Sequence, residues 1–134
     1  IEVTESKRPQ SEDFQSLVTV EVHGSDDSIA VSGTLFTGEE ARLVSVDGYR
    51  VDALPAGHML VARNRDEPGV IGFIGTVLGD NDMNIAGMFN ARETIGGEAL
   101  TVYNLDDEIS EAVLAELLDD DRIIEVTAIE LNGE

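Results

Sequence analysis

Residues 58–92 read HMLVARNRDEPGVIGFIGTVLGDNDMNIAGMFNAR, and this stretch decides the fold. Its first part, His58–Arg63, is apolar on both faces, which predicts a central strand. Pro68 and Gly69 then open a helix over Val70–Leu78, whose apolar residues share one wide face. The stretch therefore begins as a strand followed by an amphipathic helix.

The pattern continues to residue 131 with two strands, a second helix and a last strand. Gly79–Asp82 ends the first helix, and Asn84–Arg92 and Ala99–Leu105 are predicted as strands joined by a hairpin loop at Thr94–Gly97. Acidic residues precede a second helix, where the helix dipole favours them. The apolar residues that repeat at helical spacing there are Ile109, Val113, Leu114, Leu117 and Leu118. Arg122–Leu131 is predicted as the closing strand.

This order, βαββαβ, is the ferredoxin-like arrangement, an α+β fold with both helices on one face of an antiparallel sheet. The other face and the sheet edges are left for solvent or for a partner. Open edges of this kind commonly pair with another subunit. We therefore expect a partner subunit at this face or edge.

The N-terminal part has a different rhythm, which predicts a small antiparallel β segment. Residues 1–13 are polar and begin without Met, so we expect a piece of a longer polypeptide. Asp47-Gly48 is a favoured two-residue hairpin turn. The predicted strands are 18–22, 29–36, 43–46 and 49–54. We expect two domains, a partial β-rich domain over 1–57 and a ferredoxin-like domain over 58–134.

The composition excludes several classes of function. The chain has 28 Asp and Glu against 8 Lys and Arg, a formal net charge of −20, and it has no Cys. A chain with this much negative charge repels phosphate backbones and anionic lipid. We therefore expect neither a nucleic-acid partner nor a membrane partner. Without Cys there is no disulfide, thiolate metal site or cysteine nucleophile. We expect a cytoplasmic protein.

The basic residues suggest adaptation to salt. Lys7 is the one lysine, and every other basic residue is Arg. Abundant carboxylates with little lysine indicate a halophilic source, such as a halophilic archaeon, because molar salt screens the self-repulsion of the fold. An ordinary acidic domain is the alternative.

Few residues offer catalytic chemistry. The glycines Gly69, Gly72, Gly75 and Gly79 do not match a nucleotide-binding loop, and close helix packing is the favoured interpretation. The two histidines lie in strands, and no carboxylate group has the spacing of a metal site. We predict no catalytic residue, no metal site and no cofactor within this chain.

One segment, residues 64–69, places polar groups between a strand end and a helix N-terminus. Backbone N–H groups at such a terminus favour a carboxylate, and Asp66 could hold an ammonium beside it. Asn84, after the helix, offers a donor and an acceptor. Together these groups suit an amino acid. The alternative is structural: Asp66 caps the helix and Asn84 makes a turn.

The same residues carry a family resemblance. The run RNRDEPGVIGFIGTVLGDNDMNIAGMFNARETIGGEALTVYNLD, with the closing IIEVTAIEL, resembles an ACT domain, in particular that of the D-3-phosphoglycerate dehydrogenase family. The upstream VSGTLFTGEEARLVSVDGYRVDALPAGHMLVARN resembles the intervening domain that precedes it in the long form of that enzyme. The resemblance implies a regulatory tail without the substrate and nucleotide domains, so that NAD binds elsewhere in the parent enzyme.

The resemblance also implies a ligand and its residues. ACT domains of this family pair side by side and hold L-serine at the junction, which places the effector positions at Asn64, Asp66 and Asn84. Asn84 would reach a ligand held mainly by the partner subunit. Two alternatives remain open, the regulatory part of an iron–sulfur L-serine dehydratase and an assembly module that binds no ligand.

The intervening domain of this family is associated with a basic pocket for a phosphate-bearing anion. Arg42 and Arg50 lie on the two arms of the Asp47-Gly48 hairpin and are the candidate residues. Ion pairing of these arginines with nearby carboxylates, such as Asp52, is the alternative.

Overall fold

A computed structural model describes residues 2–8, 17–23, 28–35 and 41–131 of the chain, with side-chain burial from residue 42 onward. The chain divides into two compact units, Ile1–Pro55 and Ala56–Glu134. Each unit has its own antiparallel sheet, and no strand is shared between the two sheets.

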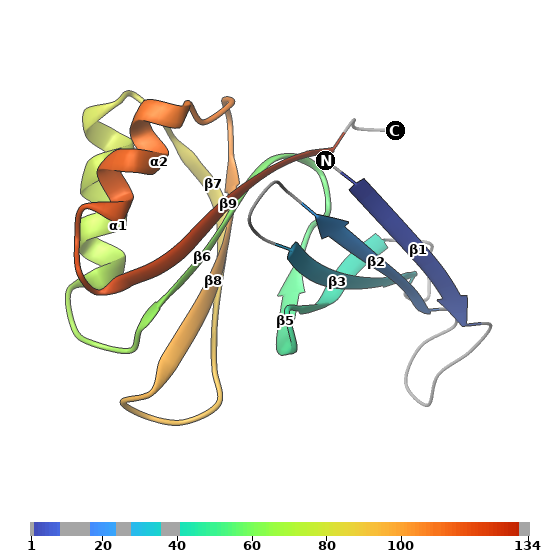
Figure 1. Cartoon of the computed structure of the whole chain (residues 1–134). Helices are drawn as coiled ribbons and strands as arrows, with labels where there is room; N and C mark the ends of the chain where they lie inside the picture. The colour runs from blue at the N-terminus through green and yellow to red at the C-terminus, as the bar shows by residue number, and fades with distance from the viewer. Residues whose placement is uncertain (1, 9–16, 24–27, 36–40, 132–134) are drawn as a thin grey trace. The chain divides into compact units, whose positions relative to one another are not determined.

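The first unit is a meander of five strands, each paired with the next along the chain (Figure 1). The strands are β1 Glu2–Arg8, β2 Leu17–His23, β3 Ser28–Leu35, β4 Ala41–Val46 and β5 Tyr49–Ala53. The hairpin prediction at Asp47-Gly48 is confirmed: both residues have positive φ, 51° and 87°, and Val46 pairs with Tyr49 across the turn. Such a pair of left-handed residues gives the twist that a tight hairpin needs.

Strand β1 corrects the sequence prediction, which left residues 1–13 as a polar lead without a strand. Glu2–Arg8 pairs antiparallel with β2 along its whole length, from Glu2 opposite His23 to Arg8 opposite Leu17. An edge strand gains its stability from backbone hydrogen bonds to its neighbour, so a polar sequence can form one. Hydrophobic periodicity alone gives no signal for such a strand.

The second unit confirms the ferredoxin-like βαββαβ prediction. Its sheet has the order β7-β8-β6-β9 with antiparallel pairing throughout. Both helices lie on one side of this sheet (Figure 1). The elements are β6 Gly57–Arg65, α1 Val70–Asp80, β7 Ile85–Arg92, β8 Glu98–Leu105, α2 Glu111–Leu118 and β9 Ile123–Leu131. The predicted central position of the first strand is confirmed, since β6 lies between β8 and β9.

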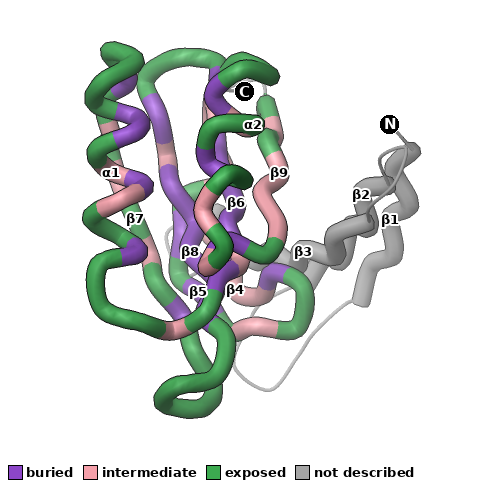
Figure 2. The backbone as a smooth tube through the Cα atoms, turned by 60° about the vertical axis from the view of Figure 1, so that its left-hand side comes forward, coloured by how far each residue is buried: buried purple, intermediate pink, exposed green. Residues whose placement is uncertain are grey.

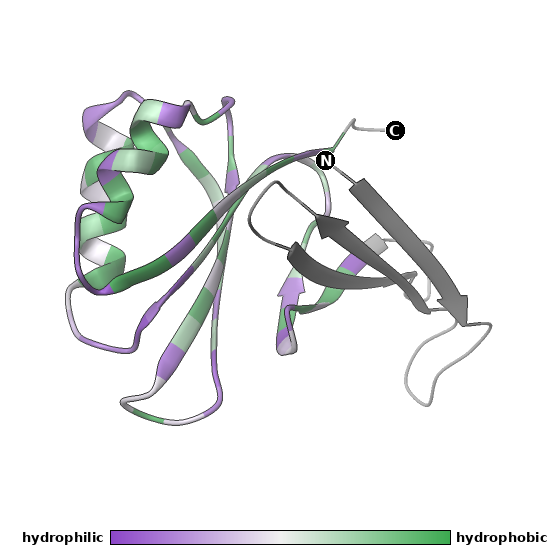
Figure 3. Ribbon diagram, viewed as in Figure 1, coloured by the Kyte–Doolittle hydropathy of each residue, from purple (hydrophilic) through white to green (hydrophobic). Residues whose placement is uncertain are grey.

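A hydrophobic core fills the space between the two helices and the sheet. Buried residues of the helices face the strands, and hydrophobic residues run along both layers (Figures 2 and 3). Tyr103, from β8, is fully buried within this core. Burial raises the pKa of its hydroxyl to about 12, against a smaller opposing effect of the Thr101 side chain. The leucines and isoleucines of this core are Leu60, Ile74, Leu78, Leu105, Ile109, Leu117 and Ile123.

Helix boundaries differ slightly from the predicted ones. Helix α1 continues through Gly79 to Asp80, because Asn81 closes it with backbone bonds to Gly79 and Leu78 rather than glycine breaking it. Helix α2 begins after Ser110, whose side chain accepts a hydrogen bond from the Val113 amide at 3.3 Å. The acidic run 106–108 precedes the helix, as predicted, and Glu111 is the acidic residue of the first turn.

The sequence predicts that the glycines at 69, 72, 75 and 79 allow close helix packing, and this prediction is wrong for three of the four. A Cβ atom added at Gly72, Gly75 or Gly79 would meet no described atom within 4 Å. Gly69 differs, since its φ of 90° is left-handed and the added atom would lie 3.4 Å from the Arg122 side chain. The requirement for glycine at this position comes from the backbone conformation at the helix start.

Candidate functional site

Asn64 lies near the end of β6 and is buried, with 3% of its surface exposed. Its side-chain amide donates a hydrogen bond to the Arg65 carbonyl at 2.6 Å. Its Oδ1 atom is buried and accepts no hydrogen bond within the described part of the chain. Buried polar atoms are nearly always paired in proteins, so an acceptor in this state is suited to a donor from outside the chain.

Asp66 follows β6 directly and is tied to the loop between β7 and β8. Its Oδ2 atom accepts hydrogen bonds from the Gly96 amide at 3.1 Å and from Arg92 Nη1 at 2.9 Å. Its own amide donates to the Gly97 carbonyl at 2.9 Å. The Gly96 amide and then the Arg92 guanidinium hold the pKa of Asp66 below its ordinary value of 3.8. Asp66 is therefore a carboxylate at neutral pH.

The structural alternative for Asp66, a cap on α1, is wrong. The N-cap residue of α1 is Gly69, which supplies no side chain, and the first turn contains no acidic residue. The N-terminal amides of α1 therefore lack a carboxylate partner from the side chains of this helix start. Such a terminus carries a partial positive charge that favours an anion.

Arg122 braces the same loop from the start of β9. Its guanidinium makes two bonds to the Asp120 carboxylate, at 2.9 and 2.8 Å, and its Nη1 atom donates to the Pro68 carbonyl at 3.4 Å. Its backbone carbonyl accepts from the Arg65 amide at 2.8 Å. These contacts fix the path of residues 65–69 between the strand and the helix.

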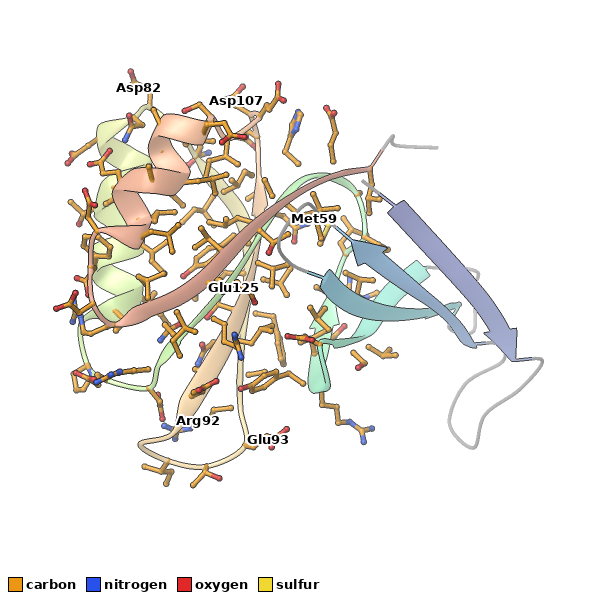
Figure 4. The ribbon with its side chains drawn as sticks, in the orientation of Figure 1. Met59, Asp82, Arg92, Glu93, Asp107 and Glu125 are labelled. Carbon is orange, nitrogen blue, oxygen red and sulfur yellow. The ribbon has the colours of Figure 1, made fainter. Side chains whose placement is uncertain are left out.

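Asn84 lies at the opposite end of α1 from Asp66. Its side-chain amide donates to Asp106 at 3.1 Å, and its carbonyl accepts from the Asp106 amide at 3.2 Å. Figure 4 shows Asp82 and Asp107 at this end of the sheet and Arg92 at the other. Asn64 and Asp66 lie near each other at the end of β6. The 11 residues of α1 span about 16 Å, so Asn84 lies apart from both of them within one chain.

Sequence reasoning missed Arg92 as a member of this site. Ala99 of β8 pairs with Asn64 of β6 on one side and with Arg92 of β7 on the other. Directly paired residues of neighbouring strands point to the same face, so these three residues form one row. The G-G pair of the hairpin loop was the available signal, because it allows Gly96 and Arg92 to approach Asp66.

The two arginines predicted to bind an anion, Arg42 and Arg50, lie on the adjacent strands β4 and β5. Arg42 Nε and Nη2 both contact Asp52 Oδ1 at 2.8 Å, so the ion-pair alternative is realised for Arg42. Arg50 is exposed on β5, and its strand neighbour two residues on is Asp52. Residues two apart on a strand share a face, so both arginines lie beside the same carboxylate. Anion binding by Arg42 and Arg50 stays a prediction.

Comparison with known proteins gives one consistent family. The D-3-phosphoglycerate dehydrogenase intervening domain matches residues 1–47. The chain is similar to D-3-phosphoglycerate dehydrogenases over nearly all of its length. It is 38% identical to the enzyme of Archaeoglobus fulgidus over 98% of this chain and 25% of the relative. It is 33% identical to that of Bacillus subtilis over 88% and 22%, and 29% identical to that of Methanocaldococcus jannaschii over 98% and 25%.

The chain thus spans about a quarter of the length of these dehydrogenases, which are larger proteins. Among the described residues, no helix is long and apolar enough to cross a membrane. In the same part of the chain, no three His, Asp or Glu side chains gather in a way that could hold a metal ion.

Proposed function

We propose that this chain is a regulatory module of a D-3-phosphoglycerate dehydrogenase, an ACT domain with part of an intervening domain, which binds L-serine and joins subunits. The similarity over 98% of the chain to the Archaeoglobus fulgidus enzyme supports the parent enzyme. The Bacillus subtilis and Methanocaldococcus jannaschii relatives are dehydrogenases as well, which favours this parent over an iron–sulfur L-serine dehydratase. Serine biosynthesis is then the process that the module serves.

The observation that carries the ligand proposal is the presence of Asn64 and Asp66 in the segment that leads into α1. A buried acceptor, an ionised carboxylate and a helix N-terminus without a side-chain cap meet at one junction. An α-amino acid offers the matching groups, an ammonium for the carboxylate and a carboxylate for the helix amides. L-Serine is the end product that a feedback signal to this dehydrogenase would report.

The separation of Asn84 from this junction supports a site shared between two copies. Strand β7 is an edge of its sheet, and its Met88 side chain is 46% exposed. An exposed edge with an apolar side chain is suited to pairing with another strand. A second copy paired along β7 would supply its own Asn84 to the ligand. Homo-oligomer formation through ACT–ACT pairing is therefore part of the proposal.

The parent enzyme would bind NAD outside this chain. The sequence lacks G-x-G-x-x-G, so the residues present do not fit a dinucleotide. We place the catalytic and NAD-binding domains elsewhere in the parent and assign this chain regulation alone. Serine bound between two copies would shift the quaternary state, with a coupling free energy of about 1–3 kcal/mol.

The test is calorimetric titration of L-serine into the chain in roughly molar KCl, with the oligomeric state measured by light scattering. We expect a dimer or larger oligomer that binds L-serine. Asp66→Asn should weaken binding at least about ten-fold, because a charged hydrogen bond is worth about 1.5–3 kcal/mol. A dimeric sample that binds no serine would reduce the proposal to an assembly module.

A pair of surface variants separates the shared site from a site within one copy. Met88→Asp places a charge on the β7 edge and should abolish both dimerisation and serine binding. Leu118→Asp is the matched control, since Leu118 is 49% exposed on α2, which packs on β9 at the opposite edge of the sheet from β7. Leu118→Asp should retain both properties. Serine binding by a monomeric Met88→Asp variant would contradict the shared site.

A further inference from the structure

Basic residues are few in this chain, 8 against 28 acidic residues, and one of them, Arg92, lies at the candidate site. It comes from the hairpin end of β7, where Figure 4 shows it beside Glu93. Its side chain is 48% exposed, while that of its partner Asp66 is 18% exposed. The cation of the pair is therefore accessible to solvent, and its anion is more buried.

The hydrogen bonds of the pair leave one side of each group open. Both bonds to the Asp66 carboxylate end on Oδ2, and within the described residues Oδ1 accepts no hydrogen bond. Arg92 uses Nη1 for this contact. A guanidinium carries five N–H donors in a planar fork, so one contact leaves the edge that fits a carboxylate.

Asn64 and Arg92 lie on either side of a small residue in the sheet. Ala99, between Asn64 and Arg92 in the row across the sheet, has only a methyl group and is 1% exposed. The two polar side chains therefore flank a short residue. Asn64 contributes the buried Oδ1 atom that accepts no bond in the described chain.

We propose that Arg92 binds the carboxylate of the amino-acid effector together with the amides at the start of α1, while Asp66 Oδ1 binds its ammonium. The adjacent opposite charges, 2.9 Å apart, match the charge pair of a zwitterion. Arg92 is thereby a specificity-determining residue that selects α-amino acids over amines without a carboxylate. This inference rests on the proposed function, because it concerns the ligand of the same site.

The test compares two ligands that differ in one group. L-Serine carries a carboxylate, and L-serinamide carries a neutral amide on the same skeleton. Calorimetry at about pH 6 keeps both ammonium groups protonated. The wild-type chain should bind L-serine at least about ten-fold more tightly than L-serinamide, since a charge-assisted bond is the stronger one. Arg92→Gln should reduce this preference at least about three-fold, mainly by weakening L-serine, while the helix amides retain the remainder.

Arg63→Gln is the matched control. Arg63 precedes Asn64 on β6 and so points to the opposite face, where it lies 3.5 Å from both Glu98 and Glu125. It removes the same charge and also breaks ion pairs, yet it should keep the preference for L-serine. Arg92→Lys should restore part of that preference, because lysine keeps the charge without the planar fork. Thermal melts of all variants check that they are folded.

The outcomes separate the two proposals. If the wild-type chain prefers L-serine and Arg92→Gln weakens both ligands equally, Arg92 merely orients Asp66, and the inference is wrong while serine binding stands. The inference is also wrong if Arg92→Gln tightens L-serine, since Arg92 would then compete with the ammonium. If the wild-type oligomer binds neither ligand, the proposed function and the inference fail together.

Discussion

At the scale of single residues, two carboxylates of the second unit are held by an arginine and a backbone amide together. Asp66 and Asp120 each accept a backbone amide and an arginine, and both have lowered pKa values. The two differ in their setting. Asp66 Oδ1 accepts no hydrogen bond within the described residues, whereas both oxygens of Asp120 are bonded to Arg122. Asp66 is therefore suited to binding and Asp120 to holding the loop before β9.

Asp120 gives a pH-dependent contribution to folding with a known sign. Its hydrogen bonds to the Arg122 side chain, and then to the Arg122 amide, lower its pKa from 3.8 to about 2. A carboxylate with a lowered folded-state pKa stabilises the fold above its unfolded pKa, and this stabilisation is lost as the pH falls through the folded value. The contribution should be complete above about pH 4 and should disappear as the pH falls to about 2.

Denaturant unfolding of Asp120→Asn and wild type in molar salt measures this contribution. The stability difference should be constant above about pH 4 and should shrink toward pH 2. Asp121→Asn is the control, since it removes the same charge from the exposed next residue. A difference for Asp120→Asn that stays unchanged down to pH 2 would contradict the ion-pair explanation.

At the scale of elements, the start of α1 depends on one backbone conformation. Gly69 has a φ of 90°, in the left-handed region, and its carbonyl accepts the first helical bond from Phe73 at 2.9 Å. Gly69→Ala should destabilise the second unit by about 1–2 kcal/mol through this strain. The added methyl lies at an ordinary 3.4 Å from a flexible Arg122 atom, so a clash adds little.

Gly72→Ala, one turn later in the same helix, makes the matched comparison. Gly72 is exposed, has no positive φ, and an added Cβ would meet no described atom within 4 Å. Alanine there should stabilise the chain by about 0.5–1 kcal/mol, because glycine is the poorer helix former. The melting temperature and the denaturant midpoint should therefore fall for Gly69→Ala and rise for Gly72→Ala. Equal destabilisation by both would exclude the conformational explanation for Gly69.

Most of the second unit's fold was predictable from sequence because its elements are amphipathic or fully apolar. The periodicity of Val70–Leu78 and the continuous apolar run of His58–Arg63 specify a helix and a central strand. Strand β1 was not predictable in this way, since its pairing with β2 uses backbone groups that every sequence has. Element ends also escaped prediction where a backbone bond, as at Asn81, sets the boundary.

The site was predictable only in part, for a related reason. Asn64 and Asp66 are close in sequence, so a strand-to-helix junction already places them together. Arg92 is 26 residues from Asp66 and reaches it because β7 pairs with β8 in one register. A shift of one residue would turn Arg92 to the other face of the sheet. Pairing register is a tertiary property, which the periodicity of one strand does not specify.

At the scale of the whole molecule, the dominant feature is the net charge of −20. Most arginines of the described chain are already paired with carboxylates, including Arg42, Arg63, Arg92 and Arg122. The remaining Asp and Glu side chains are largely exposed and repel one another. In dilute buffer this self-repulsion opposes folding, because the Debye length is about 10 Å at 0.1 M salt and spans neighbouring surface charges.

We therefore expect the stability of the chain to depend strongly on salt. Its melting temperature should rise steeply from dilute buffer to molar KCl, where screening shortens the Debye length to about 3 Å. Circular dichroism melts across a KCl series measure this. A flat profile would mean that the carboxylates are an ordinary acidic surface and would contradict adaptation to high salt.

Screening must be separated from the general strengthening of hydrophobic burial by salt. A variant with Asp80→Asn, Asp107→Asn, Glu111→Gln and Asp121→Asn neutralises four exposed carboxylates. It leaves the ion pairs described above intact and reduces the negative net charge from −20 to −16. If self-repulsion causes the salt dependence, this variant should melt higher than wild type in dilute buffer and converge with it in molar KCl. An offset that is the same at every salt concentration would instead assign the effect to local changes at the substituted residues. Convergence would show that screening of the acidic surface accounts for the salt dependence of folding.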